Sequence, residues 1–130
     1  MEEFKITDLS AASPREIADK IIDILDRKDA KGIKLLHVEE ETIIADYFII
    51  CNGATVTQLR SFAGEIEFRM GQCSLPPVRI EGYEEASWIV LDFSSVIVHI
   101  FNRDTRNFYN LEKLWAASKE VDISAQLTEK

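Results

Sequence analysis

The side chains that could support catalysis or metal binding are few and widely spaced in this sequence. The two histidines, His37 and His99, both lie in apolar stretches typical of strands. A lone histidine there more often packs or hydrogen-bonds than binds a metal. The chain has no G-x-x-x-x-G-K-[ST] or G-x-G-x-x-G loop for phosphates, and Ser94 and Ser95 lack the context of an activated nucleophile. We therefore predict no catalytic residues, no metal ligands and no cofactor.

Single carboxylates are the remaining candidates for chemistry. Nucleotidyl transfer usually needs paired aspartates, as in D-x-D, to hold a divalent metal, and this sequence contains no such pair. Asp46 begins an apolar stretch and Asp92 ends one, so each fits a turn or cap residue, or an acidic contact for a basic partner. A metal-dependent nucleotidyltransferase stays as the enzymatic alternative, while the pattern favours a protein that is not an enzyme.

The charge of the chain constrains its partners. The formal net charge is -8 and the pI is near 4.8. Such a chain is repelled by bare nucleic acid and anionic lipid and attracted by a basic protein surface. We therefore expect no membrane partner and no sequence-specific nucleic-acid binding, although solubility alone also explains an acidic composition.

Cysteine usage and the absence of targeting signals suggest a cytoplasmic protein. Cys51 and Cys73 are not spaced as a redox or zinc motif, and Cys51 lies in an apolar run that predicts a buried free thiol. No apolar run is long enough to span a membrane, and residues 1–10 lack the apolar core of a signal peptide.

Hydrophobic periodicity predicts eight elements in the order helix, two strands, helix, three strands, helix. This order predicts an α/β (α+β) fold with a mixed five-stranded sheet flanked by helices. We expect an N-terminal lead-in over 1–12, a single domain over 13–118 and a polar, fraying tail over 119–130. The predicted strands cover residues 33–38, 46–51, 78–81, 88–92 and 96–101, and the helices begin near Ser13, Thr55 and Thr105.

Several local signals fix these elements. Ser13 and Glu16 predict a capping box, and Thr55 with Gln58 predicts a second helix cap. The almost continuously apolar run 46–51 predicts an interior strand covered on both faces. The short gap at 93–95 predicts that the strands around it form an antiparallel hairpin.

That hairpin carries the most distinctive side chains of the sequence. Alternation places Trp88 and Asp92 on one face of the first strand, and His99 with Phe101 on one face of the second. A carboxylate is costly to bury, so a partly open face would make Trp88 a binding anchor. Ordinary packing explains the same pattern, and the sequence alone does not decide between the two.

Three stretches carry a resemblance to a known family. They are ADYFIICNG (45–53), WIVLDFSSVIVHIF (88–101) and TRNFYNLEKLW (105–115). They are similar to A-D-Y-F-V-I-x-T-G, W-V-L-L-D-x-G-D-V-V-V-H-V-F and T-R-x-F-Y-x-L-E-x-L-W of the ribosomal silencing factors, known as RsfS in bacteria, with Iojap as the plant relative. The resemblance runs from about residue 9 to residue 116.

The resemblance implies a nucleotidyltransferase-like fold without the catalytic motif. It implies binding to ribosomal protein fourteen of the large ribosomal subunit, which blocks association with the small subunit and represses translation under nutrient limitation. A homodimer is a further expectation. A large-subunit assembly factor stays as an alternative, because it would need the same docking surface.

Matched positions give the expected partner contacts. They are Trp88, Asp92, His99, Arg106 and Tyr109, with Asp46 as a weaker candidate.

Two places depart from the family pattern. The family's Gly-Asp in the hairpin turn is Ser94–Ser95 here, and its Arg-His pair early in the second helix is Thr57–Gln58. Any contacts made at these two places are expected to differ.

Overall fold

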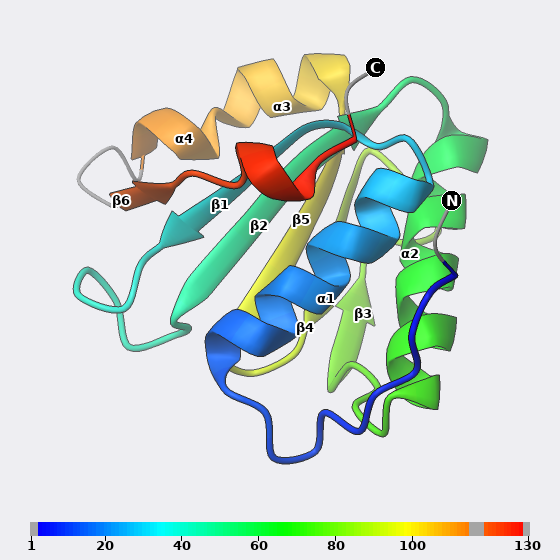
Figure 1. The fold of residues 1–130 in the computed structure, drawn as a ribbon. Helices are drawn as coiled ribbons and strands as arrows, with labels where there is room; N and C mark the ends of the chain where they lie inside the picture. Colours follow the sequence, from blue (N-terminus) through cyan, green and yellow to red (C-terminus); the bar gives the residue numbers. More distant parts are fainter. Residues whose placement is uncertain (1–2, 115–118, 129–130) are drawn as a thin grey trace.

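The computed structural model describes residues 3–114 and 119–128 (Figure 1). Its first eight elements follow the predicted order, and Figure 1 shows α1 lying across one face of the sheet with α2 beside it. The elements are α1 (Pro14–Arg27), β1 (Lys31–His37), β2 (Tyr47–Gly53), α2 (Val56–Gln72), β3 (Arg79–Glu81), β4 (Trp88–Asp92), β5 (Val96–Asn102), α3 (Arg103–Tyr109), α4 (Leu111–Leu114), β6 (Lys119–Val121) and the 3-10 turn η1 (Ser124–Gln126).

The sheet is mixed and has the strand order β3-β4-β5-β2-β1-β6. Among the described strands, β2 and β5 run parallel and each other neighbouring pair is antiparallel. The strand β2 lies between β5 and β1, which confirms the interior strand predicted from its continuous apolar run. The antiparallel hairpin of β4 and β5 is confirmed as well.

The prediction of five strands is wrong, because the sheet has six. The sixth strand, β6, pairs with β1 at the sheet edge and lies in the segment that was expected to fray. Beyond it Ile123 is buried, and the Thr128 amide donates to both carboxylate oxygens of Asp26 at 3.0 and 3.1 Å. The expected domain boundary at residue 118 lies outside the described residues.

Alternation along the strands separates two apolar layers. One layer, with Leu35, Ile49 and Val98, packs beneath α1 and α2. The other layer lies on the opposite face of the sheet and includes Phe48 and Phe101, together with other apolar residues: Leu36, Val38, Ala45, Ile50, Ile97 and Leu111. Leu111 of α4 belongs to this second layer, and the partly buried Trp88 and Val90 pack against it.

Both predicted helix caps are present. Ser13 and Glu16 exchange their two side-chain-to-backbone hydrogen bonds, which completes the capping box of α1. Thr55 caps α2 by accepting from the Gln58 amide at 3.1 Å, while the Gln58 side chain accepts from the Ala54 amide at 2.7 Å. The helix α3 begins two residues earlier than expected, because Asn102 caps it by accepting from the Thr105 amide at 2.8 Å.

The hairpin turn shows how the departure from the family pattern is accommodated. Ser94 has φ +72°, in the left-handed region that favours glycine. Asp92 Oδ1 accepts a hydrogen bond from the Ser94 amide at 2.7 Å, which supports this conformation. The turn therefore keeps a backbone that suits glycine while carrying a serine.

Candidate functional site

Trp88 lies at the start of β4, on the face of the sheet opposite α1 and α2. Its ring centroid is 5.1 Å from that of Phe101, the residue directly opposite on β5, and 4.7 Å from that of Tyr109 at the end of α3. The indole is half-buried, so one part of it packs while the rest meets solvent. Aromatic rings at these separations attract one another beyond the area they bury.

His99 is placed to hold that indole in position. Its Nδ1 accepts a hydrogen bond from the Trp88 Nε1–H at 3.1 Å, and its ring meets Phe48 edge-on at 5.0 Å. The imidazole is buried, and burial lowers the pKa of His99 to about 4. A neutral ring with Nδ1 as acceptor carries its proton on Nε2, which has no hydrogen-bond partner within the described residues. His99 is thus a positioning residue behind Trp88 and is largely shielded from a partner.

Tyr109 completes the exposed part of this aromatic cluster. It is the last residue of α3, and its side chain is 49% exposed. The next residue, Asn110, has φ +47°, which ends α3 before Leu111 turns inward in α4. The break between the two helices therefore presents Tyr109 beside Trp88 at the surface.

Arg106 lies on the same helix but faces the interior. Its Nη1 donates to the Gly32 carbonyl at 2.8 Å and to Asn52 Oδ1 at 2.7 Å, while Nε and Nη2 donate to the Glu112 carboxylate at 3.2 and 3.1 Å. Gly32 has φ +60°, and a Cβ there would collide with this guanidinium. Burial tends to raise the pKa of Glu112, but Arg106 and Lys34 outweigh it and hold this pKa below its usual value. The geometry gives Arg106 a structural role, tying α3 and α4 to β1 and β2.

The two acidic candidates lie at the opposite end of the hairpin from Trp88. Asp92 accepts from Arg79 Nη2 at 3.0 Å and from the Ser94 amide. The Asp46 amide donates to the Ser95 carbonyl at 2.8 Å, just before β2 begins. At roughly 3.3 Å per strand residue, Asp92 is about 13 Å from Trp88.

The structure thus divides the predicted set into three groups. Trp88, His99 and Tyr109 form one aromatic cluster. Asp92 and Asp46 lie at the end of the sheet that holds the hairpin turn, and Arg106 is buried. Arg79, which pairs with Asp92, was missed because a lone arginine on a three-residue strand gives no sequence signal.

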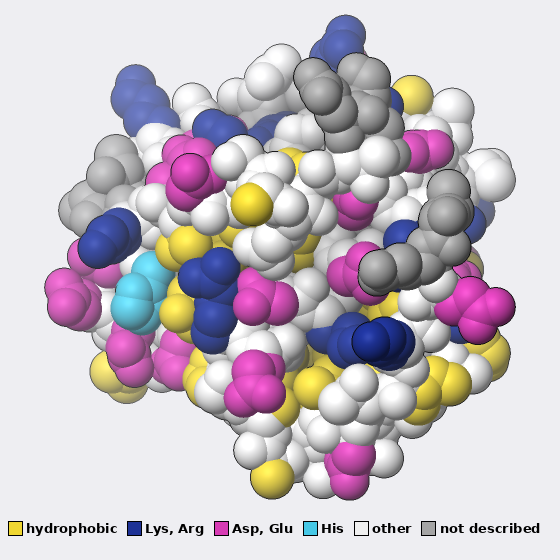
Figure 2. Space-filling view, in the orientation of Figure 1, with side chains coloured by type: hydrophobic (Ala, Val, Ile, Leu, Met, Phe, Trp, Pro, Cys, Tyr) yellow, Lys and Arg dark blue, Asp and Glu magenta, His cyan; other side chains and the backbone are white. Residues whose placement is uncertain are grey.

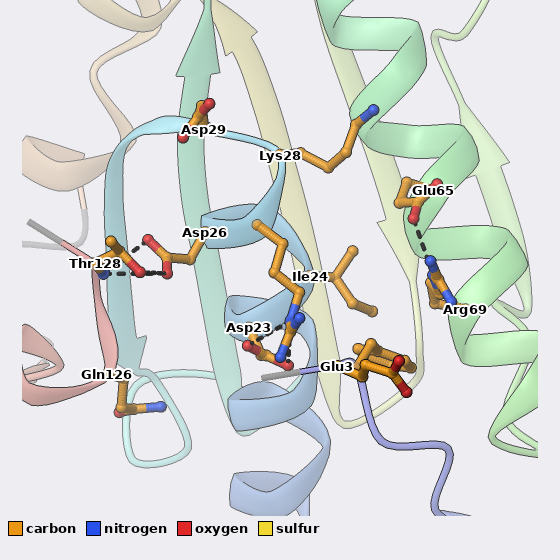
Figure 3. A pocket seen from close by; sticks show the side chains of 12 residues that line it. Glu3, Asp23, Ile24, Asp26, Lys28, Asp29, Glu65, Arg69, Gln126 and Thr128 are labelled. Carbon is orange, nitrogen blue, oxygen red and sulfur yellow. Dashed lines mark hydrogen bonds and ion pairs between the residues drawn. The ribbon is translucent and has the colours of Figure 1, made fainter. Parts of the chain in front are cut away.

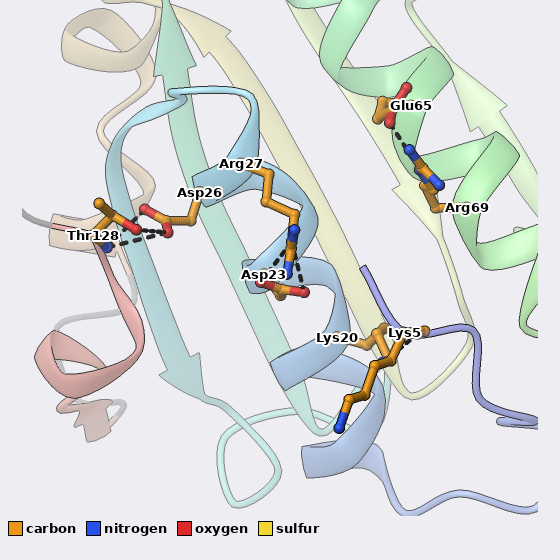
Figure 4. A network of polar contacts seen from close by, with 8 residues as sticks. All are labelled: Lys5, Lys20, Asp23, Asp26, Arg27, Glu65, Arg69 and Thr128. Carbon is orange, nitrogen blue, oxygen red and sulfur yellow. Dashed lines mark hydrogen bonds and ion pairs between the residues drawn. The ribbon is translucent and has the colours of Figure 1, made fainter. Parts of the chain in front are cut away.

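An open groove of about 1020 Å³ lies on the opposite side of the molecule, between α1 and α2 (Figure 3). The ring of Phe4 is surrounded there by Lys20, Arg27 and Arg69, at 5.0, 5.9 and 5.2 Å from its centroid. Figure 4 shows Arg27 paired with Asp23 and Arg69 paired with Glu65. The N-terminal segment lies in this groove through Glu3 and Phe4. Arg27 and Arg69 are paired with carboxylates of their own helices, so these cations are not set aside for a ligand.

Within residues 3–114 and 119–128, no cluster of three or more histidine, cysteine, aspartate or glutamate side chains could hold a metal ion. None of the helices in these ranges is long and apolar enough to cross a membrane.

The sequence profile of a family described as "Ribosomal silencing factor during starvation" matches residues 11–130. The chain belongs to this family. The Ribosomal silencing factor RsfS of Halalkalibacterium halodurans is 33% identical over 116 residues, which cover 89% of this chain and 99% of that protein. The RsfS of Bacillus subtilis is 38% identical over 98 residues, covering 75% and 83% of the two chains.

Solved structures agree with this membership. The crystal structure of protein CV0518 from Chromobacterium violaceum is 25% identical and superposes with a TM-score of 0.78, covering 80% of this chain and 87% of that one. More distant relatives include the Iojap protein of Zea mays, at 28% identity, which this chain covers for 41% of its length. A mouse relative named "Mitochondrial assembly of ribosomal large subunit protein 1" is 31% identical over 112 residues, 49% of its length.

Membership of the ribosomal silencing factors relates this chain to regulation of translation at the ribosome. The bacterial relatives are named as regulatory factors and not as enzymes. In this ribosomal silencing factor, the three stretches that resemble the family fall on β2, on the β4–β5 hairpin and on the segment that includes α3 and α4. The same stretches supply the aromatic cluster and its support.

Proposed function

We propose that this ribosomal silencing factor binds ribosomal protein fourteen of the large ribosomal subunit through the face formed by Trp88, Tyr109 and Asp92. The bound protein sterically blocks association with the small subunit and so represses translation under nutrient limitation. This activity belongs to the cytoplasm and needs no cofactor, catalysis or sequence-specific contact with nucleic acid. The fold is then a nucleotidyltransferase-like scaffold used for binding.

The observation that carries this proposal is a half-exposed tryptophan fixed from behind. Trp88 is held by the His99 hydrogen bond and by the ring of Phe101, while exposed Tyr109 extends the aromatic surface. Tryptophan and tyrosine dominate the energetics of protein interfaces, and an anchor that is already positioned loses little entropy on binding.

Charge supports a basic partner. The net charge of -8 favours approach to a basic ribosomal protein and disfavours bare RNA. Asp92 at the far end of the same face pairs with Arg79, which is 61% exposed, so a basic partner can compete for this carboxylate. The acidic charge therefore supports faster association, and the aromatic cluster supports a slower dissociation.

The proposal is tested with isolated large ribosomal subunits. The protein should cosediment with them and should lower the yield of joined ribosomes when small subunits are added. Binding to purified ribosomal protein fourteen should persist without ribosomal RNA. If the protein does not bind large subunits, or binds them without affecting joining, the proposed function is wrong.

A second candidate function is large-subunit assembly. It is favoured by the mouse relative, whose name states assembly of the mitochondrial large subunit. An assembly factor would cause precursor subunits to accumulate when it is deleted during rapid growth. A silencing factor would instead alter recovery from nutrient downshift, with normal subunit profiles before it.

A further inference from the structure

The loop between β1 and β2 presents two adjacent isoleucines to solvent. Ile43 is fully exposed and Ile44 is 63% exposed. Hydrogen bonds from backbone amides fix the shape of the loop. The Val38 amide donates to the Asp46 carbonyl at 2.8 Å, and the Ile44 amide donates to the side-chain oxygen Oγ1 of Thr42 at 3.2 Å. A hydrogen-bonded turn with a paired apolar tip suits association, because covering that tip removes apolar surface from water.

Carboxylates flank this apolar tip in the sequence. Three exposed glutamates precede the tip by one intervening residue, and Asp46 follows it after Ala45. The glutamates are Glu39, Glu40 and Glu41. Figure 2 shows acidic and apolar side chains gathered around a histidine at the left margin, where Figure 1 places this loop. An apolar centre with an acidic rim is complementary to an apolar depression bordered by lysine or arginine side chains.

The loop is continuous with the proposed ribosome-binding face. Tyr47 pairs with Val96 in the parallel register, which places the β1–β2 loop and the β4–β5 turn at the same end of the sheet. The amides of Asp46 and Tyr47 both donate to the Ser95 carbonyl, at 2.8 and 3.1 Å. The neighbouring Ser94 is hydrogen-bonded to Asp92, so the loop extends the strip that begins at Trp88.

The size of a stable protein interface also favours a contact surface longer than the strip between Trp88 and Asp92. The strip between Trp88 and Asp92 is about 13 Å long at strand spacing. A stable protein interface covers about 800 Å² on each partner, a patch roughly 30 Å across. At this end of the sheet the β1–β2 loop supplies two adjacent exposed apolar side chains, Ile43 and Ile44, that can lengthen this strip.

We infer that Ile43 and Ile44 form a second contact with the same basic large-subunit protein, entering an apolar depression bordered by basic side chains. This inference rests on the proposed function and adds the second contact region of the interface. The glutamates Glu39, Glu40 and Glu41 steer the loop to this depression.

The test compares binding of the full-length variants to isolated large ribosomal subunits. Replacing both isoleucines (Ile43→Ala with Ile44→Ala) should weaken affinity roughly tenfold, about 1.4 kcal/mol. The matched control is Ile6→Ala, because Ile6 is 59% exposed and precedes α1 in the chain. Replacing the three glutamates with glutamine should slow association and reduce its salt dependence, with little change in dissociation.

The outcomes separate this inference from the proposed function. If the unmodified protein does not bind large subunits, the proposed function fails, and the second contact fails with it. If Trp88→Ala weakens binding while the double isoleucine variant binds like Ile6→Ala, only the second contact is overturned. If sedimentation velocity shows a dimer that the double variant abolishes, and subunit binding is unchanged, the loop binds a second copy of this chain and the inference is wrong.

Discussion

The indole Nε1–H of Trp88 donates a hydrogen bond to Nδ1 of His99 across 3.1 Å, between neighbouring strands of the β4–β5 hairpin. The two residues are diagonal neighbours, because Trp88 is opposite Phe101 and His99 is opposite Val90. A diagonal pair meets through long side chains. Here Nδ1 of the imidazole accepts a hydrogen bond from the N–H of a half-buried indole. The hydrogen bond requires Nδ1 of His99 to carry no proton.

Stability should therefore depend on pH through His99. Burial lowers its pKa to about 4 in the folded chain, against an ordinary value of 6.5. Below pH 6.5 the His99 side chain is protonated in the unfolded chain, but in the folded chain it stays neutral down to about pH 4. The free energy of unfolding therefore falls as the pH is lowered from 6.5 to 4. The loss should reach up to about 3 kcal/mol.

Urea unfolding at several pH values measures this dependence. The His99→Gln variant removes the titrating ring but keeps an acceptor for the indole. The difference in unfolding free energy between the two proteins should shrink as the pH is lowered from 6.5 to 4. A difference that does not change with pH would show that the imidazole does not resist protonation in the folded chain.

Trp88 should be the main source of binding energy at the large subunit. The Trp88→Ala variant should lose roughly 2 kcal/mol or more, about thirtyfold in affinity, because it removes the anchor of the aromatic cluster. Phe68→Ala is the control, since Phe68 is exposed but lies on α2, on the other side of the sheet. Titration of large subunits with labelled protein gives both affinities. Equal affinity of the two variants would remove Trp88 from the interface.

Most of the fold follows from local sequence patterns. The bounds of β4 are those predicted, because alternation and β-branched residues define Trp88–Asp92 well. The strand β6 was missed because Lys119–Val121 has little apolar character, and pairing of its backbone with β1 is what defines it. Such edge pairing is a tertiary effect that a short sequence window does not contain.

The site was also only partly predictable, because several of its contacts join residues that are far apart in the sequence. Strand alternation grouped Trp88 with Asp92 and His99 with Phe101, but it could not show that His99 supports Trp88 from within. Arg106 resembled a surface residue in the sequence. Its acceptors on Gly32 and Asn52 come from distant strands, so its burial depends on tertiary contacts.

The hairpin turn should gain stability from glycine at its strained position. Ser94 has φ +72°, and the left-handed conformation costs a residue with a side chain about 1 kcal/mol relative to glycine. Ser94→Gly should therefore raise the free energy of unfolding by about that amount. Ser95→Gly is the control and should lower it, because Ser95 has no positive φ and glycine only adds freedom to the unfolded chain. Urea denaturation of both variants tests the difference, and a Ser94→Gly protein no more stable than the unmodified chain would contradict it.

Arg106 should matter for stability and not for affinity. Lysine cannot reproduce the paired hydrogen bonds to Glu112 together with those to Gly32 and Asn52, so Arg106→Lys should lower the free energy of unfolding by about 2 kcal/mol. The matched control is Arg103→Lys, which changes an exposed arginine of the same helix and should shift stability by less than about 0.5 kcal/mol. Under conditions in which both variants are fully folded, their affinities for large subunits should equal that of the unmodified chain. A folded Arg106→Lys protein with tenfold weaker binding would instead make Arg106 a direct partner contact.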